Sequence, residues 1–510
     1  MRKTVWKRSV FAERSRRWVS IISGLCLVQP LTGCFVGYEK TDAALDVPTR
    51  YQEAGRGKPH AAVPAMDWWR GFRSPELTAL MEEALMANID IAAAVARIRA
   101  ADAQARILGA PLLPTVNLNA FAQRSRPSQT TNPGGSTSSS SGPSERTLYS
   151  TSLSASYEID FWGKNRATLL AAEETAVAAR FEREVVAITT LASVGNTYFV
   201  VLAAQDRLRI AYENVRAATR ILNLLKEREA AGTASALDIA QQESIVATQR
   251  ATIPPIEQLQ RESVAILALL IGRAPEFLRI KGGSMSRIAT PRITPGLPSE
   301  LLTQRPDIRQ AEALLSAGNA NVESARAAFF PSIQLTGEGG FQSAALKMLF
   351  NPPSAFYTIA AGLTQPILDG FRLRGVLEQT KARQQELLEL YRKSVVSGFV
   401  DVDRALIAVQ ESARREVLQR QAVVAARRAF DISETRFREG TIDLVTVLIT
   451  QQTLFQAEDV LAQARLLRLQ AVVSLFQALG GGWAKVAPEA LLTNEAANPP
   501  EIEGVPTRPR

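Results

Sequence analysis

The sequence predicts an α+β membrane protein in which a tandem repeat combines very long helices with four transmembrane β-strands. The repeat is visible in one pair of segments: LLPTVNLNAFAQ (112–123) returns 217 residues later as FFPSIQLTGEGGFQ (329–342). Four segments alternate between apolar and polar residues, which is the period of a β-strand. Two long runs contain no proline, 144–253 and 367–487, so helices there are free to continue for many turns.

The first 33 residues are expected to be an export signal. They hold seven Lys or Arg and one Glu, which is +6 of the formal net charge of +9, and the apolar run at their end is too short to span a bilayer. The run ends in LTGC (31–34), which is typical of a bacterial lipoprotein signal. We therefore expect Cys34 to become the lipidated N-terminus. The other cysteine, Cys26, lies in the removed segment, so no disulfide is expected.

Charge and motifs argue against nucleic-acid binding and catalysis. Outside the signal the net charge is only +3, which gives no electrostatic footprint for nucleic acid. The chain has one histidine, His60, and lacks GxxxxGK[ST], HExxH, GxSxG and any spaced Cys and His set. We therefore expect no enzyme activity, no metal site and no cofactor apart from the covalent lipid. The scattered Asp and Glu stand at helical surface spacing and are expected on solvated faces.

Each predicted strand has one apolar and one polar face. Lengths of about nine to twelve residues suit tilted transmembrane strands, although a soluble half-buried sheet has the same period. A loop rich in Ser, Gly and Pro (128–145) joins the first two strands and 343–354 joins the second two, so both loops lie on one side and the helical ends on the other. The strands are predicted at 115–123, 149–160, 332–342 and 356–364.

Four strands cannot stand alone in a membrane. They leave two open sheet edges, which lipid does not tolerate, and they are too few to close a barrel. Several copies of the chain must therefore share one barrel. No apolar run of 18 residues is expected after the signal, so strands and not helices are expected to cross the bilayer.

The proline-free runs predict the two longest helices, at 163–230 and 370–438. The first is about 100 Å long at 1.5 Å per residue, and its apolar stripe from Val177 to Leu202 has a mean spacing of about 3.6 residues. That stripe alone also fits a soluble bundle or coiled coil. The Pro254-Pro255 pair is expected to bend one of the shorter helices. These are predicted at 76–110, 236–271, 306–328 and 443–479.

Both long helices end in a sharp reversal, at REAAGTASALD (228–238) and RFREGTIDLVT (436–446). Gly232 and Gly440 stand at equivalent places, 208 residues apart, and each is expected to be a C-cap with positive φ. RPDI (305–308) is expected to start a helix and GGGW (480–483) to stop one.

These elements divide the chain into two repeats of helix, strand, loop, strand, long helix, tip and helix. The first repeat is predicted at 76–275 and the second at 301–485. The other predicted segments are the signal (1–33), a lipid-anchored extended segment (34–75), a connector (276–300) and a flexible tail (486–510).

Several of these stretches resemble one known family. The run GLPSELLTQRPDIRQAEALLSAGNANVESARAAFFPSIQLTG (296–337), the two tips, YEIDFWGKNR (157–166) and ALGGGW (478–483) are similar to the TolC-like outer-membrane efflux proteins, in their lipoprotein branch. The resemblance covers most of the chain after the signal. It implies a homotrimer whose twelve strands close one outer-membrane β-barrel, continued by a periplasmic α-helical barrel.

The same resemblance implies a passive exit duct of a tripartite multidrug efflux system. An inner-membrane RND-type transporter would supply the energy, and a periplasmic adaptor protein would dock at the helical tips. The protein is then expected in the outer membrane of a Gram-negative bacterium, held by lipid and extending into the periplasm. The pump and not the duct selects the cargo, so the sequence leaves the cargo open.

Site residues follow from the family motifs at matching positions. Cys34 takes the place of the lipidated cysteine, which carries palmitate. The family often has acidic residues where this chain has Thr446 and Ile449. Val445 lies one helical turn before Ile449, so we expect an apolar inner mouth. Asp238 is then the carboxylate candidate. The adaptor-docking tips are predicted to contain Arg228, Gly232, Leu237, Asp238, Arg436 and Gly440.

Two alternatives remain at this point. One is a lipid-anchored periplasmic coiled-coil scaffold without a pore, which the long helices allow but the four alternating strands disfavour. The other is a duct for type I secretion of peptides or proteins, which needs the same architecture.

Overall fold

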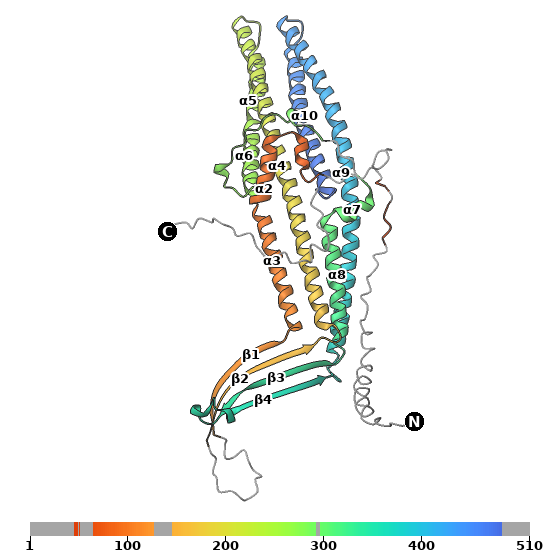
Figure 1. Cartoon of the computed structure of the whole chain (residues 1–510). Helices are drawn as coiled ribbons and strands as arrows, with labels where there is room; N and C mark the ends of the chain where they lie inside the picture. The colour runs from red at the N-terminus through yellow and green to blue at the C-terminus, as the bar shows by residue number, and fades with distance from the viewer. Residues whose placement is uncertain (1–44, 49, 52–64, 127–144, 292–295, 482–510) are drawn as a thin grey trace, which may run out of the picture. The chain divides into compact units, whose positions relative to one another are not determined.

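The computed structural model describes residues 45–48, 50–51, 65–126, 145–291 and 296–481 (Figure 1). The predictions for Cys34, for the signal and for the C-terminal tail lie outside these residues. The chain divides into two compact units, and each takes residues from both repeats. We call them the strand unit (described parts of 104–172 and 316–385) and the helix unit (described parts of 42–103, 173–315 and 386–510).

One four-stranded antiparallel sheet forms the strand unit, in the order β1-β2-β3-β4. The predicted strands are all confirmed, with ends that move by at most three residues. Because β2 pairs with β3, the two hairpins lie side by side, and β1 and β4 are the open edges (Figure 1). The bounds are β1 (Thr115–Ser125), β2 (Arg146–Ile159), β3 (Ser332–Ser343) and β4 (Ala355–Thr364).

The strand register places the four apolar faces on the same side of the sheet. Leu118 pairs with Leu153, Leu153 with Gly339, and Gly339 with Tyr357. Successive side chains of a strand point to opposite faces, so the next residue of each strand belongs to the polar side. There Asn119 donates to Ser154 Oγ at 3.0 Å, Gln334 to Ser156 Oγ at 3.0 Å, and Ser152 to Glu338 at 2.7 Å.

Helices make up most of the described chain. The two longest, one in each repeat, have 67 residues each and start within two residues of their predicted positions. The first repeat contains α2 (Pro75–Ala87), α3 (Ile89–Gly109), α4 (Lys164–Ala230), α5 (Ala236–Ala251) and α6 (Ile253–Leu270). The second contains α7 (Pro298–Gln304), α8 (Pro306–Ala327), α9 (Arg372–Arg438) and α10 (Leu444–Ala478). Single 3-10 turns are η2 (Trp68–Phe72), η3 (Ala110–Leu112), η5 (Pro275–Phe277), η6 (Met285–Arg287), η7 (Leu346–Met348) and η8 (Pro352–Ser354).

Two of the shorter predicted helices are each broken in two. The helix expected at 76–110 breaks at Asn88, which is extended with ψ 131°. The Asn88 side chain accepts from Ile91 N–H at 3.0 Å, as an N-cap does, and donates to the Leu270 carbonyl at 2.7 Å. The helix expected at 236–271 breaks at Thr252, directly before the turn that contains Pro254. The proline pair was expected to bend one helix, and the structure has two helices instead.

The predicted apolar stripe of α4 forms part of the core of the helix unit. All stripe residues except Val185 are buried, namely Val177, Phe181, Ile188, Leu191, Val194, Tyr198 and Leu202. Phe199 beside them packs on Phe72 with ring centroids 5.1 Å apart. An 18-residue window of α4 is apolar enough to cross a membrane by composition, which corrects the expectation that no such run follows the signal. Because 61% of that window is buried inside the protein, the run serves as a core helix.

Candidate functional site

The two helix tips have the same backbone turn. Gly232 has φ 72° and Gly440 has φ 74°, so both predicted C-caps are confirmed. One residue later Thr233 N–H donates to the Arg228 carbonyl at 2.8 Å, and Thr441 N–H donates to the Arg436 carbonyl at 2.9 Å. This is the Schellman arrangement of a helix end. A Cβ at either glycine would meet no atom of the described residues within 4 Å, so the positive φ and not crowding requires glycine.

The caps of the returning helices use an acid and a hydroxyl residue in reverse order. At α5, Asp238 accepts from Ser235 N–H and Ser235 Oγ, both at 2.9 Å, while Ser235 Oγ accepts from Asp238 N–H. At α10, Asp443 accepts from Thr446 N–H at 2.9 Å and from the Thr446 hydroxyl at 2.6 Å. Those hydroxyl and backbone bonds lower the pKa of the exposed Asp443. The sequence analysis missed Asp443, although its type before an apolar helix start is a known capping signal.

Arg228 and Arg436 differ most between the tips. The Arg228 guanidinium donates to the carbonyls of Phe437, at 2.6 Å, and Arg438, at 3.0 Å, and lies 4.4 Å from the centroid of the Phe437 ring. It thereby joins the first tip to the C-terminal end of α9, where a cation also complements the helix dipole. Arg436 is exposed, and no side-chain partner is found for it among the described residues.

The remaining predicted tip residues lie on the surface. Leu237 is 65% exposed and its counterpart Val445, 208 positions later, is 52% exposed. Ile449, one turn after Val445, is 60% exposed, so an apolar pair occupies this face of α10. The Thr446 hydroxyl donates to Asp443. Asp238 is the only carboxylate among the predicted mouth residues.

Three carboxylates correct the expectation that Asp and Glu lie on solvated faces. Asp206, Glu416 and Glu458 are only 4%, 5% and 8% exposed, because each occupies a contact between helices or between a helix and the connector. Glu458 pairs with Arg427, but burial raises its pKa above the ordinary value. Hydrophobic periodicity did not predict the burial of these residues, because a buried polar residue interrupts the apolar pattern just as an exposed one does.

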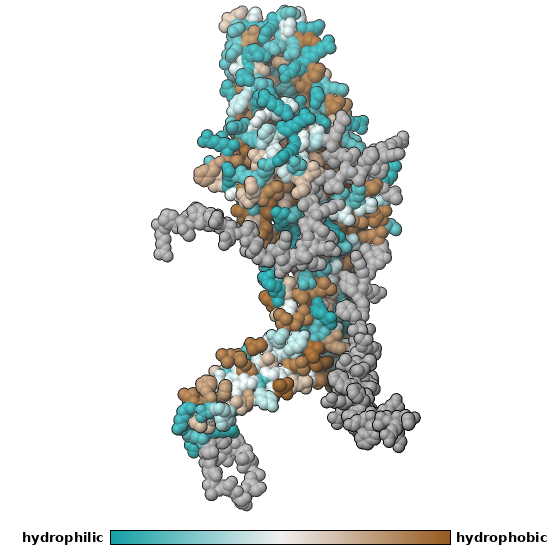
Figure 2. Space-filling view, viewed as in Figure 1, coloured by the Kyte–Doolittle hydropathy of each residue, from teal (hydrophilic) through white to brown (hydrophobic). Residues whose placement is uncertain are grey.

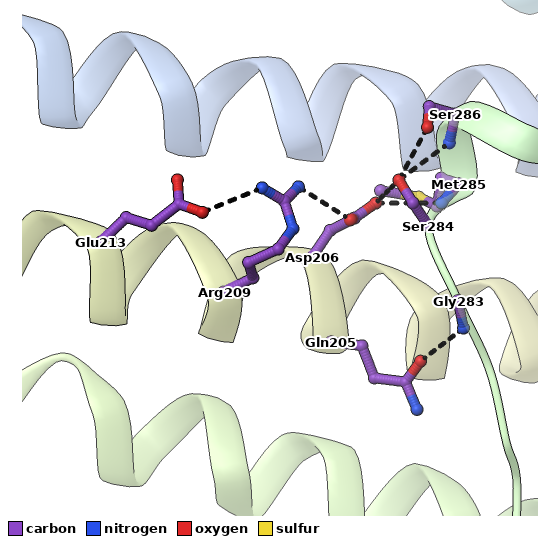
Figure 3. A network of polar contacts seen from close by, with 8 residues as sticks. All are labelled: Gln205, Asp206, Arg209, Glu213, Gly283, Ser284, Met285 and Ser286. Atoms are coloured by element: carbon purple, nitrogen blue, oxygen red, sulfur yellow. Dashed lines mark hydrogen bonds and ion pairs between the residues drawn. The ribbon is translucent and has the colours of Figure 1, made fainter.

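Asp206 and its neighbours hold the connector against α4, as Figure 3 shows. Asp206 accepts from Arg209 at 3.1 Å, from the Ser284 hydroxyl at 3.1 Å and from Met285 N–H at 2.9 Å. Gln205 accepts from Gly283 N–H at 3.0 Å. The side chains of α4 therefore satisfy backbone donors of a segment that has little secondary structure of its own.

Glu416 joins α9 to α10 in the second repeat. It accepts from Arg468 at 2.7 Å and from Arg420 at 2.6 Å, and Arg465 lies 3.5 Å away. Burial by itself would raise the pKa of Glu416, but the hydrogen bonds from Arg468 and Arg420 bring it below the ordinary value. A buried carboxylate needs such partners, because an unpaired charge there is strongly unfavourable.

RPDI starts α8 as predicted, but Arg305 also has a contact role that the sequence did not indicate. Its guanidinium pairs with Asp307 at 2.6 Å and Asp401 at 3.1 Å and donates to the Ala478 carbonyl at 3.2 Å. Arg305 thus connects α8, α9 and the end of α10. The predicted helix stop is confirmed for the part that is described, since Gly480 and Gly481 have φ 92° and 63°.

The apolar face of the sheet is open to the surroundings of the chain. Val116, Leu118 and Ile359 are 63%, 72% and 83% exposed, and Figure 2 shows apolar residues gathered over the visible side of the strand unit. An exposed apolar face of this extent marks a lipid or protein contact. Among the described residues no group of His, Cys, Asp and Glu is arranged to hold a metal ion.

A family model for outer membrane efflux proteins matches residues 80–273 and 297–481, in both repeats. The chain belongs to the outer membrane efflux protein family. It is 41% identical to the pyoverdine export outer membrane protein OpmQ of Pseudomonas aeruginosa, over 92% of this chain and 98% of that protein. It is 31% identical to the toluene efflux pump outer membrane protein TtgC of Pseudomonas putida, over 83% and 86%.

Solved structures agree with the family assignment. The outer membrane protein VceC of Vibrio cholerae superposes with a TM-score of 0.76 at 26% identity, over 82% of this chain and 99% of that one. The chain is therefore an outer-membrane efflux channel that extends into the periplasm, with the α+β fold of the TolC-like proteins. The pore-less scaffold is disfavoured, because the relatives are efflux channels.

Proposed function

We propose that three copies of this outer membrane efflux protein close one twelve-stranded barrel and form the exit duct of a tripartite efflux system. The observation that carries the proposal is the sheet itself. It has a continuous apolar face and two open edges, β1 and β4, which lipid would leave unpaired. Pairing each β4 with the β1 of another copy removes every edge.

The native mass of the full chain, extracted in mild detergent from purified outer membranes, tests this assembly. We expect three chains per particle. A monomer that is stable under the same conditions would contradict the shared barrel.

An adaptor protein and an inner-membrane transporter are the proposed partners, with the adaptor docking at the helix tips. The tips offer matched exposed apolar residues, Leu237 and Val445, and the exposed guanidinium of Arg436. A photo-crosslinking residue at Leu237 or Val445 is expected to capture a co-expressed adaptor, whereas one at Tyr212, exposed on α4 away from the tip, is not. Equal capture at all three positions would argue against tip docking. The RND class of the transporter stays a prediction.

For the cargo we propose a pyoverdine-type siderophore, because of the 41% identity to OpmQ over nearly the whole chain. Toluene and related solvents are the second candidate, because TtgC is also a relative. Complementation separates the two. The chain is expected to restore pyoverdine in the medium of a Pseudomonas strain that lacks its pyoverdine outer-membrane component, without restoring solvent tolerance to a strain that lacks TtgC. The reverse result would favour solvent efflux, and restored release of a peptide or protein would favour type I secretion.

At the inner mouth we propose an apolar constriction of Val445 and Ile449 with Asp238 as the carboxylate. Asp238→Asn keeps an oxygen for Ser235 but removes the charge, so block of the open pore by divalent cations is expected to weaken. Asp443→Asn, at the cap of the other tip, is the matched control. Cation block that survives Asp238→Asn but disappears in Asp443→Asn would transfer the role to Asp443.

Cys34 is proposed to carry the covalent lipid that holds the N-terminus to the membrane. Metabolic labelling with a palmitate analogue is expected to mark the wild-type chain and to be lost in Cys34→Ser. Label retained in the variant would contradict this assignment. Acyl chains contribute roughly 0.8 kcal/mol per buried CH₂, so the variant is also expected to depend on its strands alone for membrane attachment.

A further inference from the structure

The residues that follow β2 contact the residues that precede β3, and the two open edges of the sheet lack the equivalent contact within the described chain. After β2, Trp162 crosses the start of the neighbouring β3. Its ring stacks on Phe330 with centroids 4.6 Å apart and an interplanar angle of 18°, and its Nε1 donates to the Pro331 carbonyl at 2.9 Å. Phe161 packs on the edge of Trp162 at 4.8 Å. The residues that follow one strand therefore cover the residues that precede the next.

The second repeat has the equivalent residues, but they are left exposed in the described chain. β4 ends like β2, and the positions that match Phe161 and Trp162 are Ile367 and Leu368, which are 89% and 90% exposed. Phe371, at the start of α9, is 75% exposed with φ 66°. Three large, exposed apolar side chains therefore lie next to an open sheet edge, and such a patch marks an interaction surface.

The matching receiving site lies at the opposite edge of the same sheet. Phe330-Pro331 before β3 corresponds to Leu113-Pro114 before β1, at an offset of 217 residues. Leu113 is 69% exposed, and Pro114 is exposed as well. The strand order places β1 and β4 at opposite edges, so the one chain does not bring these two sites together.

We propose that a second copy of this chain completes the contact, with Ile367, Leu368 and Phe371 of one protomer packed on Leu113-Pro114 of the next. This inference rests on the shared barrel proposed above. In such a barrel the junction from β4 to the next copy's β1 has the same polarity as the junction from β2 to β3, because β2 and β4 both end where β3 and β1 begin. The contact between protomers is then apolar, since Leu368 lacks the indole donor of Trp162.

Cysteine cross-linking in outer membranes tests the contact. Tagged full-length chains that carry Leu113→Cys are co-expressed with untagged full-length chains that carry Leu368→Cys, and mild oxidation is followed by non-reducing electrophoresis. A disulfide forms when Cα atoms are about 4.4–6.8 Å apart, and the internal pair used as a control below shows whether this type of contact meets that distance. We expect a tagged product of twice the chain mass, absent when either variant is expressed alone. Ile367→Cys and Phe371→Cys are used in parallel in case one geometry is unsuitable.

The first repeat supplies a matched control. Trp162→Cys combined with Phe330→Cys in one chain is expected to form a disulfide at monomer mass, because that contact is internal. If the native mass shows a trimer and the internal control oxidises, but none of the three partner variants links to the Leu113→Cys chain, this inference is wrong and the proposed function stands. If the native mass shows a monomer, the shared barrel itself is wrong.

Discussion

Gly232 and Gly440 turn the chain in the same way, with φ 72° and 74°, while the side chains around the two turns are engaged differently. Arg228 is bound to the end of α9, whereas Arg436 is exposed. The cap at α5 is Ser235 followed by Asp238, and the cap at α10 is Asp443 followed by Thr446. The two tips therefore have the same backbone conformation, while their side chains make different contacts.

Loss of the Arg228 side chain is expected to have the largest effect at the tips. Arg228→Met removes two charge-assisted hydrogen bonds to α9 carbonyls, and such bonds contribute about 1.5–3 kcal/mol. Amide hydrogen exchange over the last two turns of α4 and α9 measures the local opening free energy. Arg436→Met is the control and is expected within about 0.5 kcal/mol of wild type. Equal effects of the two substitutions would remove the asymmetry between the tips.

Substitution of either tip glycine by alanine is expected to destabilise its tip by the same amount. Gly232→Ala and Gly440→Ala each place a Cβ in left-handed backbone, at a cost of about 1–2 kcal/mol. Neither added Cβ clashes with a residue that the structure describes, so the cost is expected to come from φ. The same exchange measurement applies to each tip. Clearly unequal costs of the two substitutions would show that the backbones are not equivalent in solution.

Removal of the cap hydroxyl at the first tip is expected to have a smaller effect. Ser235→Ala removes the hydroxyl acceptor of Asp238 N–H and leaves it only the Ser235 carbonyl at 3.1 Å, and loss of such an N-cap side chain costs about 1 kcal/mol. Faster exchange is expected in the first turn of α5 only. The double change Ser235→Asp with Asp238→Thr copies the second tip and is expected to restore slow exchange. Failure of that double variant would mean that the two caps are not interchangeable.

The smallest expected effect is a pH dependence of the second tip. Hydrogen bonds from Thr446 lower the pKa of Asp443 in the folded protein below the ordinary 3.8. A group with a lowered folded pKa stabilises above its unfolded pKa, and that stabilisation is lost as the pH falls through the folded value. Exchange in the first turn of α10, corrected for intrinsic rates, is therefore expected to accelerate below pH 3.8. Thr446→Val should reduce this dependence, while Ser235→Ala at the other tip should leave it unchanged.

Local signals in the sequence were sufficient for the strands, the two 67-residue helices and the tips. These signals are period-two alternation for the strands, the absence of proline for the long helices and one glycine for each tip. They act on the backbone locally, so the elements can be predicted without knowledge of distant contacts. The same holds for the interruption near Pro254. Asn88 was the exception, because an asparagine within a helical pattern does not by itself reveal that its side chain will bind the Leu270 carbonyl.

The tertiary structure alone decided which charged residues became internal. Asp206, Glu416 and Arg305 have ordinary surface residue types, and only the packing of α4, α9, α10 and the connector surrounds them with partners. Arg228 and the Phe437 carbonyl that it binds are 209 residues apart, and Arg305 and the Ala478 carbonyl are 173 apart. Backbone preferences act over a few residues, whereas the burial and pairing of a charge depend on which distant segment packs against it. The sequence therefore determined the elements and their repetition, and the packing determined which distant segments surround and pair the buried charges.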